Sequence, residues 1–176
     1  MEKNYKEILP QITTFIFDVD GVLTNGKVQL LPDGEMVRTM SVRDGFAIKS
    51  ALEQGYNVAI ISGGTSESVR KRLNFLGVED VYLRISHKLQ KFESYCEQKQ
   101  ITPDEVLYMG DDLPDLDVLR AVALGCAPQD ADSEVLNVAN YVSHKKGGEG
   151  AARDIIEQVM RVQGKWQVEG NASKFG

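Results

Sequence analysis

Short apolar runs alternate with helical patterns along most of this chain, and this alternation constrains the fold more than any other feature. Such runs, bounded by turn residues, are typical of strands buried on both faces of a parallel sheet. They span residues 13–19, 57–62, 81–83, 106–109, 122–124 and 141–142. Repeated strand–helix units predict an α/β protein with a Rossmann-like, doubly wound and mostly parallel sheet.

Helical patterns lie between these runs. Val69, Leu73 and Leu76 have the spacing of one helix face, and Gly77 is expected to end that helix. Residues 89–99 and 150–163 also have helical patterns, and residues 102–105 predict a turn before the run at 106.

The segment 27–42 interrupts the alternation. It contains Pro32-Asp33-Gly34 between two extended stretches, which predicts a β-hairpin. The interval 18–62 is expected to hold only this hairpin and one helix, and the interval 62–88 one helix and one strand, so neither can hold a separate cap domain. We therefore expect oligomerisation to cover the site, with the hairpin as a contact, although a solvated excursion remains the alternative.

The length of 176 residues predicts one domain, spanning residues 12–164, after an extension at 1–11 and before a flexible tail at 165–176. The polar opening lacks the apolar core of a signal peptide, and no apolar run approaches a membrane span. Cys96 and Cys126 form no spacing motif, which suggests a reducing compartment. A cytoplasmic protein is expected.

The charge balance limits the partners. A net charge of −6 without a local basic cluster argues against a nucleic-acid-binding surface. An anionic substrate would therefore need a metal ion or a few well-placed cations.

The run at 13–19 leads into Asp18-Val19-Asp20-Gly21-Val22-Leu23-Thr24. At the carboxyl end of a buried strand the chain curls, so both acids can converge on one ligand in the crevice where open α/β sheets bind. One carboxylate can attack phosphorus, while the other shuttles a proton to the leaving oxygen.

Two further strand ends carry groups that bind anions. Ser62, Gly63 and Gly64 follow the run at 57–62, directly before an expected helix. A hydroxyl and free backbone N–H groups at a helix start would form an anion cradle, although Ser-Gly also makes an ordinary cap. Lys88 lies near a helix start after the run at 81–83, where a lysine alone is usually solvated.

The fourth strand end carries three carboxylates, Asp111, Asp112 and Asp115. They repel one another unless a cation offsets them, and hard oxygen ligands without nearby Cys or His pairs suit Mg²⁺. Taken together, a metal would bridge Asp18, Asp111 and a phosphate oxygen, while Ser62 and Lys88 hold the other oxygens. This arrangement predicts phosphoryl transfer.

These residues resemble a known family. DVDGVLT, the Ser62 site, Lys88 and GDDLPD match in order the four motifs of haloacid-dehalogenase-type phosphatases. The hairpin, Val42-Arg43-Asp44-Gly45 and the segment from Gly147 to Arg153 further resemble the small capless 3-deoxy-D-manno-octulosonate (KDO) 8-phosphate phosphatases. The resemblance spans about residues 12–166.

The resemblance implies an Mg²⁺-dependent phosphomonoesterase that releases KDO and phosphate and supplies sugar for bacterial lipopolysaccharide. Asp18 would become the aspartyl-phosphate and Asp20 the general acid and then base. Asp18, the Asp20 backbone carbonyl and Asp111 would bind Mg²⁺, with Asp112 or Asp115 acting behind them. The resemblance also implies a homotetramer whose hairpins pack together, and a tail that can reach a neighbouring site.

The residues leave several alternatives open. Many relatives carry arginine where Gly64 stands, so a nine-carbon sugar-acid 9-phosphate is the alternative substrate. Arg43 and Arg153 are candidates for the substrate carboxylate, with structural ion pairs equally plausible; Asp44 is an available partner for Arg43.

A non-catalytic, phospho-accepting or regulatory module on the same fold is the alternative from another class. A signalling receiver domain carries its acidic pair on the first strand and its acceptor on a later one, whereas Asp18 and Asp20 here share the first strand in a DxDGxxT context. The retention of Asp18, Asp20, Lys88 and Asp111 also argues against an idle scaffold.

Overall fold

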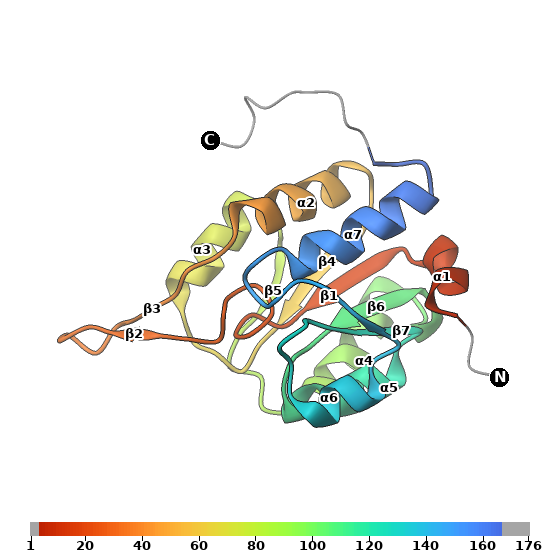
Figure 1. Cartoon of the computed structure of the whole chain (residues 1–176). Coiled ribbons are helices and arrows are strands. Elements are labelled where there is room, and N and C mark those ends of the chain that lie inside the picture. Colours follow the sequence, from red (N-terminus) through yellow and green to blue (C-terminus); the bar gives the residue numbers. More distant parts are fainter. Residues whose placement is uncertain (1–3, 167–176) are drawn as a thin grey trace.

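A computed structural model describes residues 4–166, and its centre is a six-stranded sheet in the order β5-β4-β1-β6-β7-β8 (Figure 1). The strands are β1 (Thr14–Phe17), β4 (Asn57–Ile61), β5 (Asp80–Tyr82), β6 (Val106–Met109), β7 (Leu124–Ala127) and β8 (Tyr141–Val142). Every neighbouring pair is parallel. The predicted doubly wound α/β fold is confirmed.

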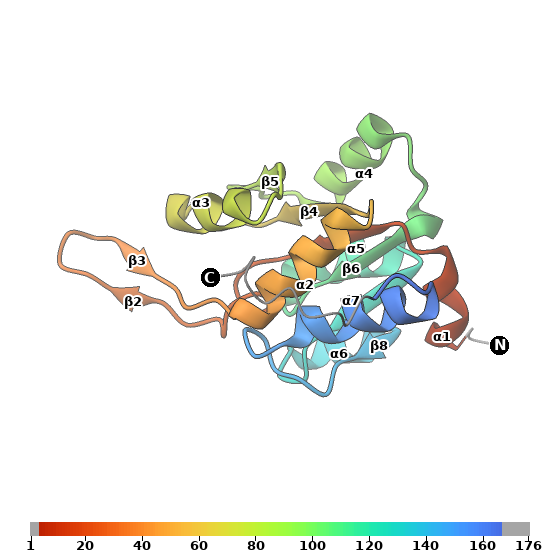
Figure 2. The same cartoon turned by 90° about the horizontal axis from the view of Figure 1, so that it is seen from above.

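Helices cover both faces of the sheet (Figures 1 and 2). The α-helices are α1 (Tyr5–Ile8), α2 (Val42–Glu53), α3 (Glu67–Phe75), α4 (Lys88–Lys99), α5 (Leu116–Ala121), α6 (Ser133–Val138) and α7 (Ala151–Val162). Short 3-10 helices span η1 (Leu9–Gln11), η2 (Pro103–Glu105) and η3 (Leu113–Asp115). Within the described residues, none of these helices is long and apolar enough to cross a bilayer.

The strands divide the core into two layers because successive side chains point to opposite faces. Phe15 and Phe17 of β1 pack with buried residues of α2, α3 and α7, whereas Ile16 packs with those of α4, α5 and α6. The same alternation places Tyr108 of β6 on the α4 side. Both faces of β1 are therefore buried, as its continuous apolar sequence predicts.

The predicted boundaries need two corrections. The strand predicted at 122–124 begins later and extends further, because Val122 caps the end of α5 and β7 spans Leu124–Ala127. The helices α1, α5 and α6 fall outside the predicted helical segments. By contrast, Gly77 does follow the end of α3 and adopts a φ of 97°.

The predicted hairpin is present as a separate two-stranded sheet of β2 (Gln29–Leu30) and β3 (Met36–Val37). It projects away from the body of the molecule, beyond the carboxyl end of β1 (Figures 1 and 2). An isolated bridge between Thr24 and Met40 closes its base. The hairpin therefore starts directly from the loop that carries Asp18 and Asp20.

The chain reverses its direction across the sheet at β1. From β1 it proceeds to β4 and β5 on one side, then returns through α4 to β6 on the other. Such a switch point opens a crevice at the carboxyl ends of the strands, where ligands bind in open α/β sheets.

The polypeptide after α7 turns back onto the domain. The backbone N–H groups of Lys165 and Trp166 both donate to the Met160 carbonyl oxygen, at 2.7 Å and 3.2 Å. The Trp166 ring lies edge-on to Phe46 of α2, with centroids 6.0 Å apart. The rest of the predicted tail lies outside the described residues.

Candidate active site

Four chain segments meet at the switch point. Asp18 follows β1 directly, Ser62 follows β4, Asp111 lies just after β6, and Lys88 is the first residue of α4. All four predicted strand ends thus contribute to one edge of the sheet. The pairing of β1 with both β4 and β6 is what brings them together.

Lys88 joins two buried carboxylates. Its Nζ lies 3.1 Å from Asp18 Oδ1 and 2.7 Å from Asp115 Oδ1, and its side chain is only 6% exposed. The Asp18 contact is close enough for an ion pair but is not aligned as a hydrogen bond. Burial alone would lower the pKa of Lys88, but the facing carboxylates outweigh this effect and raise it. The ammonium is therefore held charged beneath Asp18.

Asp115 organises the acidic loop. Its Oδ1 accepts hydrogen bonds from Lys88 and from the Tyr108 hydroxyl, and its Oδ2 accepts from the backbone N–H groups of Asp111 and Asp112 at 3.1 Å and 3.3 Å. Asp112 is exposed and caps η3 by accepting from the Leu113 N–H. Of the two acids left open by the sequence, Asp115 is the one tied to the buried cluster.

A metal ion would fit between Asp18 and Asp111. Carboxylate oxygens of Asp18, Asp111 and Asp115 lie within 4.8 Å of one another. Oδ1 of Asp18 and Oδ1 of Asp111 are buried without a hydrogen-bond partner. Buried oxygens that accept no hydrogen bond are costly, even where Lys88 lies near, and hard oxygen donors are the ligands that Mg²⁺ prefers. Since Asp115 already uses both its oxygens, the residues present suit a cation held by the other two acids.

The pKa values of both carboxylates are raised, so their charged forms are destabilised in the absence of a cation. Burial raises the pKa of Asp111 to about 8, with further contributions from Asp18 and Asp115. Burial also raises the pKa of Asp18, against the opposing effect of Lys88. Both acids would be relieved by a nearby cation.

Gly21 lets the two acidic loops approach each other. Its φ is 86°, and a Cβ built on it would lie 1.8 Å from Asp111 Oδ2. No side chain can therefore be added there without moving the Asp111 carboxylate. This explains why glycine follows the two acids in the first motif.

Asp20 is paired with a residue that sequence reasoning did not identify. Arg38, just after β3, donates from Nε to Asp20 Oδ1 at 2.6 Å and from Nη2 to Oδ2 at 3.1 Å. The Asp20 side chain is 37% exposed, whereas that of Arg38 is 8% exposed. The hairpin thus reaches back to the first motif.

Ser62 is placed as predicted, but the helix after it is not. Its side chain is buried, and Oγ accepts a hydrogen bond from Gly64 N–H at 3.1 Å. The helix α3 begins only at Glu67 and is capped by Ser66. An anion cradle at this edge would therefore consist of the Ser62-Gly63-Gly64 turn and not of a helix N-terminus.

Gly147 and Gly148 pack against the first motif from the other side. Gly148 N–H donates to the Val22 carbonyl at 2.9 Å, and a Cβ on Gly147 would lie 1.8 Å from the Gly21 carbonyl oxygen. The sequence singled out this segment only through the family resemblance. Its contact with the Asp20–Thr24 turn gives a physical reason for the two glycines.

Arg43 and Arg153 lie together, but in a different groove. It has a volume of about 580 Å³ and shares no lining residue with the carboxylate cluster. Arg153 Nε lies 3.4 Å from Glu157, and its guanidinium lies 5.5 Å from the ring centres of both Phe46 and Trp166. The candidate partner of Arg43, Asp44, instead accepts from the Arg153 backbone N–H.

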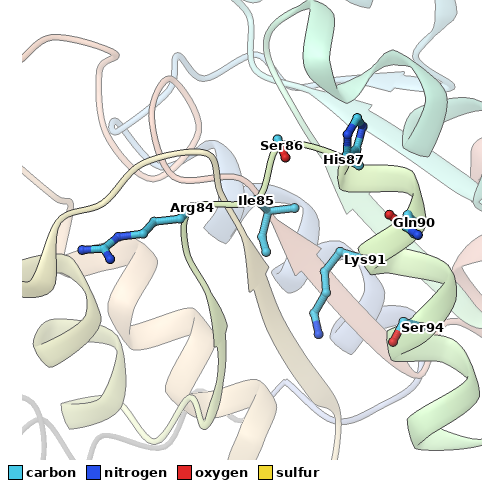
Figure 3. A pocket seen from close by; sticks show the side chains of 7 residues that line it. All are labelled: Arg84, Ile85, Ser86, His87, Gln90, Lys91 and Ser94. Carbon is cyan, nitrogen blue, oxygen red and sulfur yellow. The ribbon is translucent and has the colours of Figure 1, made fainter.

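Another cavity, of about 350 Å³, lies beside the start of α4 (Figure 3). Its walls include Ser86 and His87 before the helix and Lys91 within it, and the Arg84 side chain points away from the others. Neither Lys88 nor any of the clustered carboxylates lines it. It is therefore separate from the predicted site.

Comparison with known proteins agrees with this geometry. Residues 79–155 match the model of the haloacid dehalogenase-like hydrolases. Over 154 residues the chain is 39% identical to the KDO 8-phosphate phosphatase KdsC of Salmonella typhi and 38% identical to that of Escherichia coli K12. Each alignment covers 88% of this chain and 82% of the relative.

Solved structures give the same result. The KDO 8-phosphate phosphatase of Yersinia pestis matches with a TM-score of 0.90 and 34% identity over 93% of this chain and 88% of that one. The Moraxella catarrhalis enzyme, solved with magnesium, phosphate and KDO, matches with a TM-score of 0.89 and 27% identity over 93% and 94%. The chain therefore belongs to the KDO 8-phosphate phosphatase family of haloacid dehalogenase-like hydrolases.

Proposed function

We propose that this protein is a Mg²⁺-dependent phosphomonoesterase that hydrolyses KDO 8-phosphate to KDO and inorganic phosphate. The observation that carries the proposal is the buried Asp18, ion-paired with Lys88 and close to Asp111, with one oxygen on each acid that accepts no hydrogen bond. It is supported by the identity to the curated phosphatases over most of both chains.

The metal would be held by the carboxylates of Asp18 and Asp111 and by the backbone carbonyl of Asp20. When bound, Mg²⁺ neutralises charge on the transferring phosphoryl group and on the two acids. Asp112 and Asp115 remain outside this set: Asp115 orients Lys88 and the Asp111 backbone, and Asp112 caps the short helix η3.

In the first half of the reaction, a carboxylate oxygen of Asp18 attacks phosphorus, and the bond to the sugar oxygen breaks. Asp20 donates its proton to that oxygen, so the sugar leaves as a neutral alcohol. Lys88 and the Ser62-Gly63-Gly64 turn hold the phosphoryl oxygens during this step. Positioning and charge neutralisation contribute most of the rate enhancement in such transfers.

In the second half, the carboxylate of Asp20 takes a proton from water, and the resulting hydroxide attacks the aspartyl-phosphate. The bond between phosphorus and Asp18 breaks, which releases inorganic phosphate and restores both acids to their starting states. Asp20 therefore acts first as an acid and then as a base, and it regains from water the proton that it gave to the sugar oxygen.

The carboxylate of the sugar acid needs a cation of its own. Arg43 lines a separate groove, so it can serve only if the sugar extends from the carboxylate cluster into that groove. Of the two arginines there it is the less engaged, because Arg153 lies against Glu157 and stacks on aromatic rings. Replacing Arg43 with alanine should raise KM for KDO 8-phosphate without a similar change in kcat. The same substitution should leave KM for phosphates without a carboxylate unchanged.

We further propose a cytoplasmic homotetramer in which hairpins meet and neighbouring subunits cover each site. Hairpin side chains expose apolar surface: Leu30 is 72% exposed, and Val28 and Met36 are each 41% exposed. Apolar surface of this kind favours contact with a second copy. A Leu30→Asp variant should sediment at a lower mass than wild type while keeping its secondary structure.

The substrate assignment is tested by measuring phosphate release from KDO 8-phosphate, a nine-carbon sugar-acid 9-phosphate and hexose phosphates. Each is assayed with Mg²⁺ and with EDTA, beside Asp18→Asn. Mg²⁺-dependent preference for KDO 8-phosphate that Asp18→Asn abolishes supports the proposal. Preference for the nine-carbon substrate would keep the mechanism and change the substrate, and no release from any would refute both.

A further inference from the structure

The Arg38 side chain is largely buried, although it lies on an exposed hairpin. It lies just after β3, and its neighbours Met36 and Val37 are exposed. Its own side chain, however, is 8% exposed and turned back onto the first motif. A guanidinium loses hydration when it is buried, so such a placement needs compensating hydrogen bonds.

Each of the three guanidinium nitrogen atoms donates one of those hydrogen bonds. Nε and Nη2 donate to the two oxygens of Asp20 at 2.6 Å and 3.1 Å, and Nη1 donates to the Met36 carbonyl at 3.0 Å. The planar fork of arginine matches a carboxylate in this two-bond geometry, which a lysine cannot reproduce. The contact to Met36 ties the guanidinium to β3, so the hydrogen bonds of Arg38 connect Asp20 to the hairpin.

The pair lies beside the phosphate cradle. A Cβ built on Gly64 would be 3.4 Å from both Asp20 Oδ2 and Ser62 Oγ, and 3.9 Å from Arg38 Nη2. Only a residual cavity of about 10 Å³ remains among these residues. The guanidinium, the Asp20 carboxylate and the Ser62 hydroxyl therefore all lie close to Gly64.

We propose that Arg38 is a positioning residue for the reaction. It fixes the Asp20 carboxyl group beside the Ser62-Gly64 turn through two hydrogen bonds, of which the one to the carbonyl oxygen remains when the other oxygen carries the proton for the leaving group. This inference rests on the proposed function, in which Asp20 is the general acid. Arg38 need not touch the substrate. It restricts rotation of Asp20, which is otherwise a half-exposed side chain.

The test separates help with proton donation from general structural support. An alkyl phosphate such as KDO 8-phosphate needs its leaving oxygen protonated, whereas p-nitrophenolate leaves as a stable anion. Single-turnover release of each leaving group isolates the first half-reaction. Arg38→Ala should slow alkyl release about 10–100-fold, within the range of general acid catalysis, and aryl release no more than about threefold.

Three comparisons sharpen the result. Arg38→Lys should recover only part of the alkyl rate, because it lacks the two-bond fork. Methylguanidine, added well below denaturing concentrations, should restore alkyl release in Arg38→Ala. Lys27→Gln removes an exposed positive charge from the same excursion and should match wild type on both substrates.

Equal losses on the two substrates, absence of chemical rescue, or a rise in alkyl release for Arg38→Ala would each overturn the inference. If Arg38→Ala does not fold, Arg38→Lys alone carries the substrate comparison. The wild-type protein tests the proposed function separately. If KDO 8-phosphate is not the true substrate, the wild-type rate of alkyl release changes, but the ratio between the alkyl and aryl losses in Arg38→Ala does not. Inactivity of wild type toward every phosphate would refute the proposed function itself.

Discussion

Asp44 links the two helices that support the first motif, and its burial makes a measurable prediction. The side chain is 2% exposed; Oδ1 accepts from the Arg153 backbone N–H at 2.9 Å, and Oδ2 has no partner. Burial raises the pKa of Asp44 from 3.8 to about 6, against the smaller opposing effect of the Arg153 hydrogen bond. The folded protein therefore holds this proton more tightly than the unfolded chain.

The raised pKa of Asp44 determines how this residue's contribution to the stability of the fold changes with pH. The stability that Asp44 contributes is greatest below its unfolded pKa and is lost as the pH rises through about 6. Between about pH 4.5 and about pH 7.5, linkage gives a loss of roughly 2 kcal/mol from this group alone. Asp44→Asn cannot ionise, so the unfolding free energy of the variant should gain roughly 2 kcal/mol on that of wild type over this range.

The assay is urea unfolding followed by circular dichroism at several pH values and constant ionic strength. Asp104→Asn, which removes an exposed carboxylate, is the control and should differ from wild type by a nearly constant amount. A pH-independent difference between Asp44→Asn and wild type would refute the argument. So would a variant that loses stability relative to wild type as the pH rises.

Three further outcomes are expected. Lys88→Met leaves two buried carboxylates without their cation and should cost about 3–5 kcal/mol in urea unfolding at neutral pH; an unchanged midpoint would contradict the ion pairing. Gly147→Ala places a Cβ 1.8 Å from the Gly21 carbonyl oxygen. It should cost about 1–3 kcal/mol and reduce turnover, and a wild-type melting temperature would contradict the predicted clash. Mg²⁺ at about 100 times its Kd should stabilise wild type by about 2.7 kcal/mol in thermal unfolding. Asp111→Asn should abolish that shift, whereas an equal shift in the variant would place the metal elsewhere.

Much of the fold and of the site could be predicted because the functional residues lie at the ends of strands. Asp18 and Asp111 each follow a short apolar run, and parallel pairing necessarily brings the carboxyl ends of such runs to one edge. The boundary of β7 could not be predicted in the same way. Residues 122–127 form an unbroken run of apolar residues and glycine, so periodicity does not show where α5 ends and β7 begins.

The parts of the site that sequence did not reveal depend on the path of a turn. Arg38 meets Asp20 across 18 residues because the hairpin folds back, and no spacing rule encodes that return. Asp112 and Asp115 could not be ranked, since both lie in the same acidic loop. Only the turn through η3 directs Asp115 inward to Lys88 and Tyr108 and leaves Asp112 exposed.

The central claim is that Asp18 carries the phosphoryl group during hydrolysis of KDO 8-phosphate. Acid quenching during turnover with Mg²⁺, followed by borohydride reduction, converts an aspartyl-phosphate to homoserine, which peptide mass analysis locates. We expect homoserine at position 18, present only when substrate and Mg²⁺ are both supplied. Turnover with an unmodified Asp18, or with the reduced residue at another acid, would contradict it.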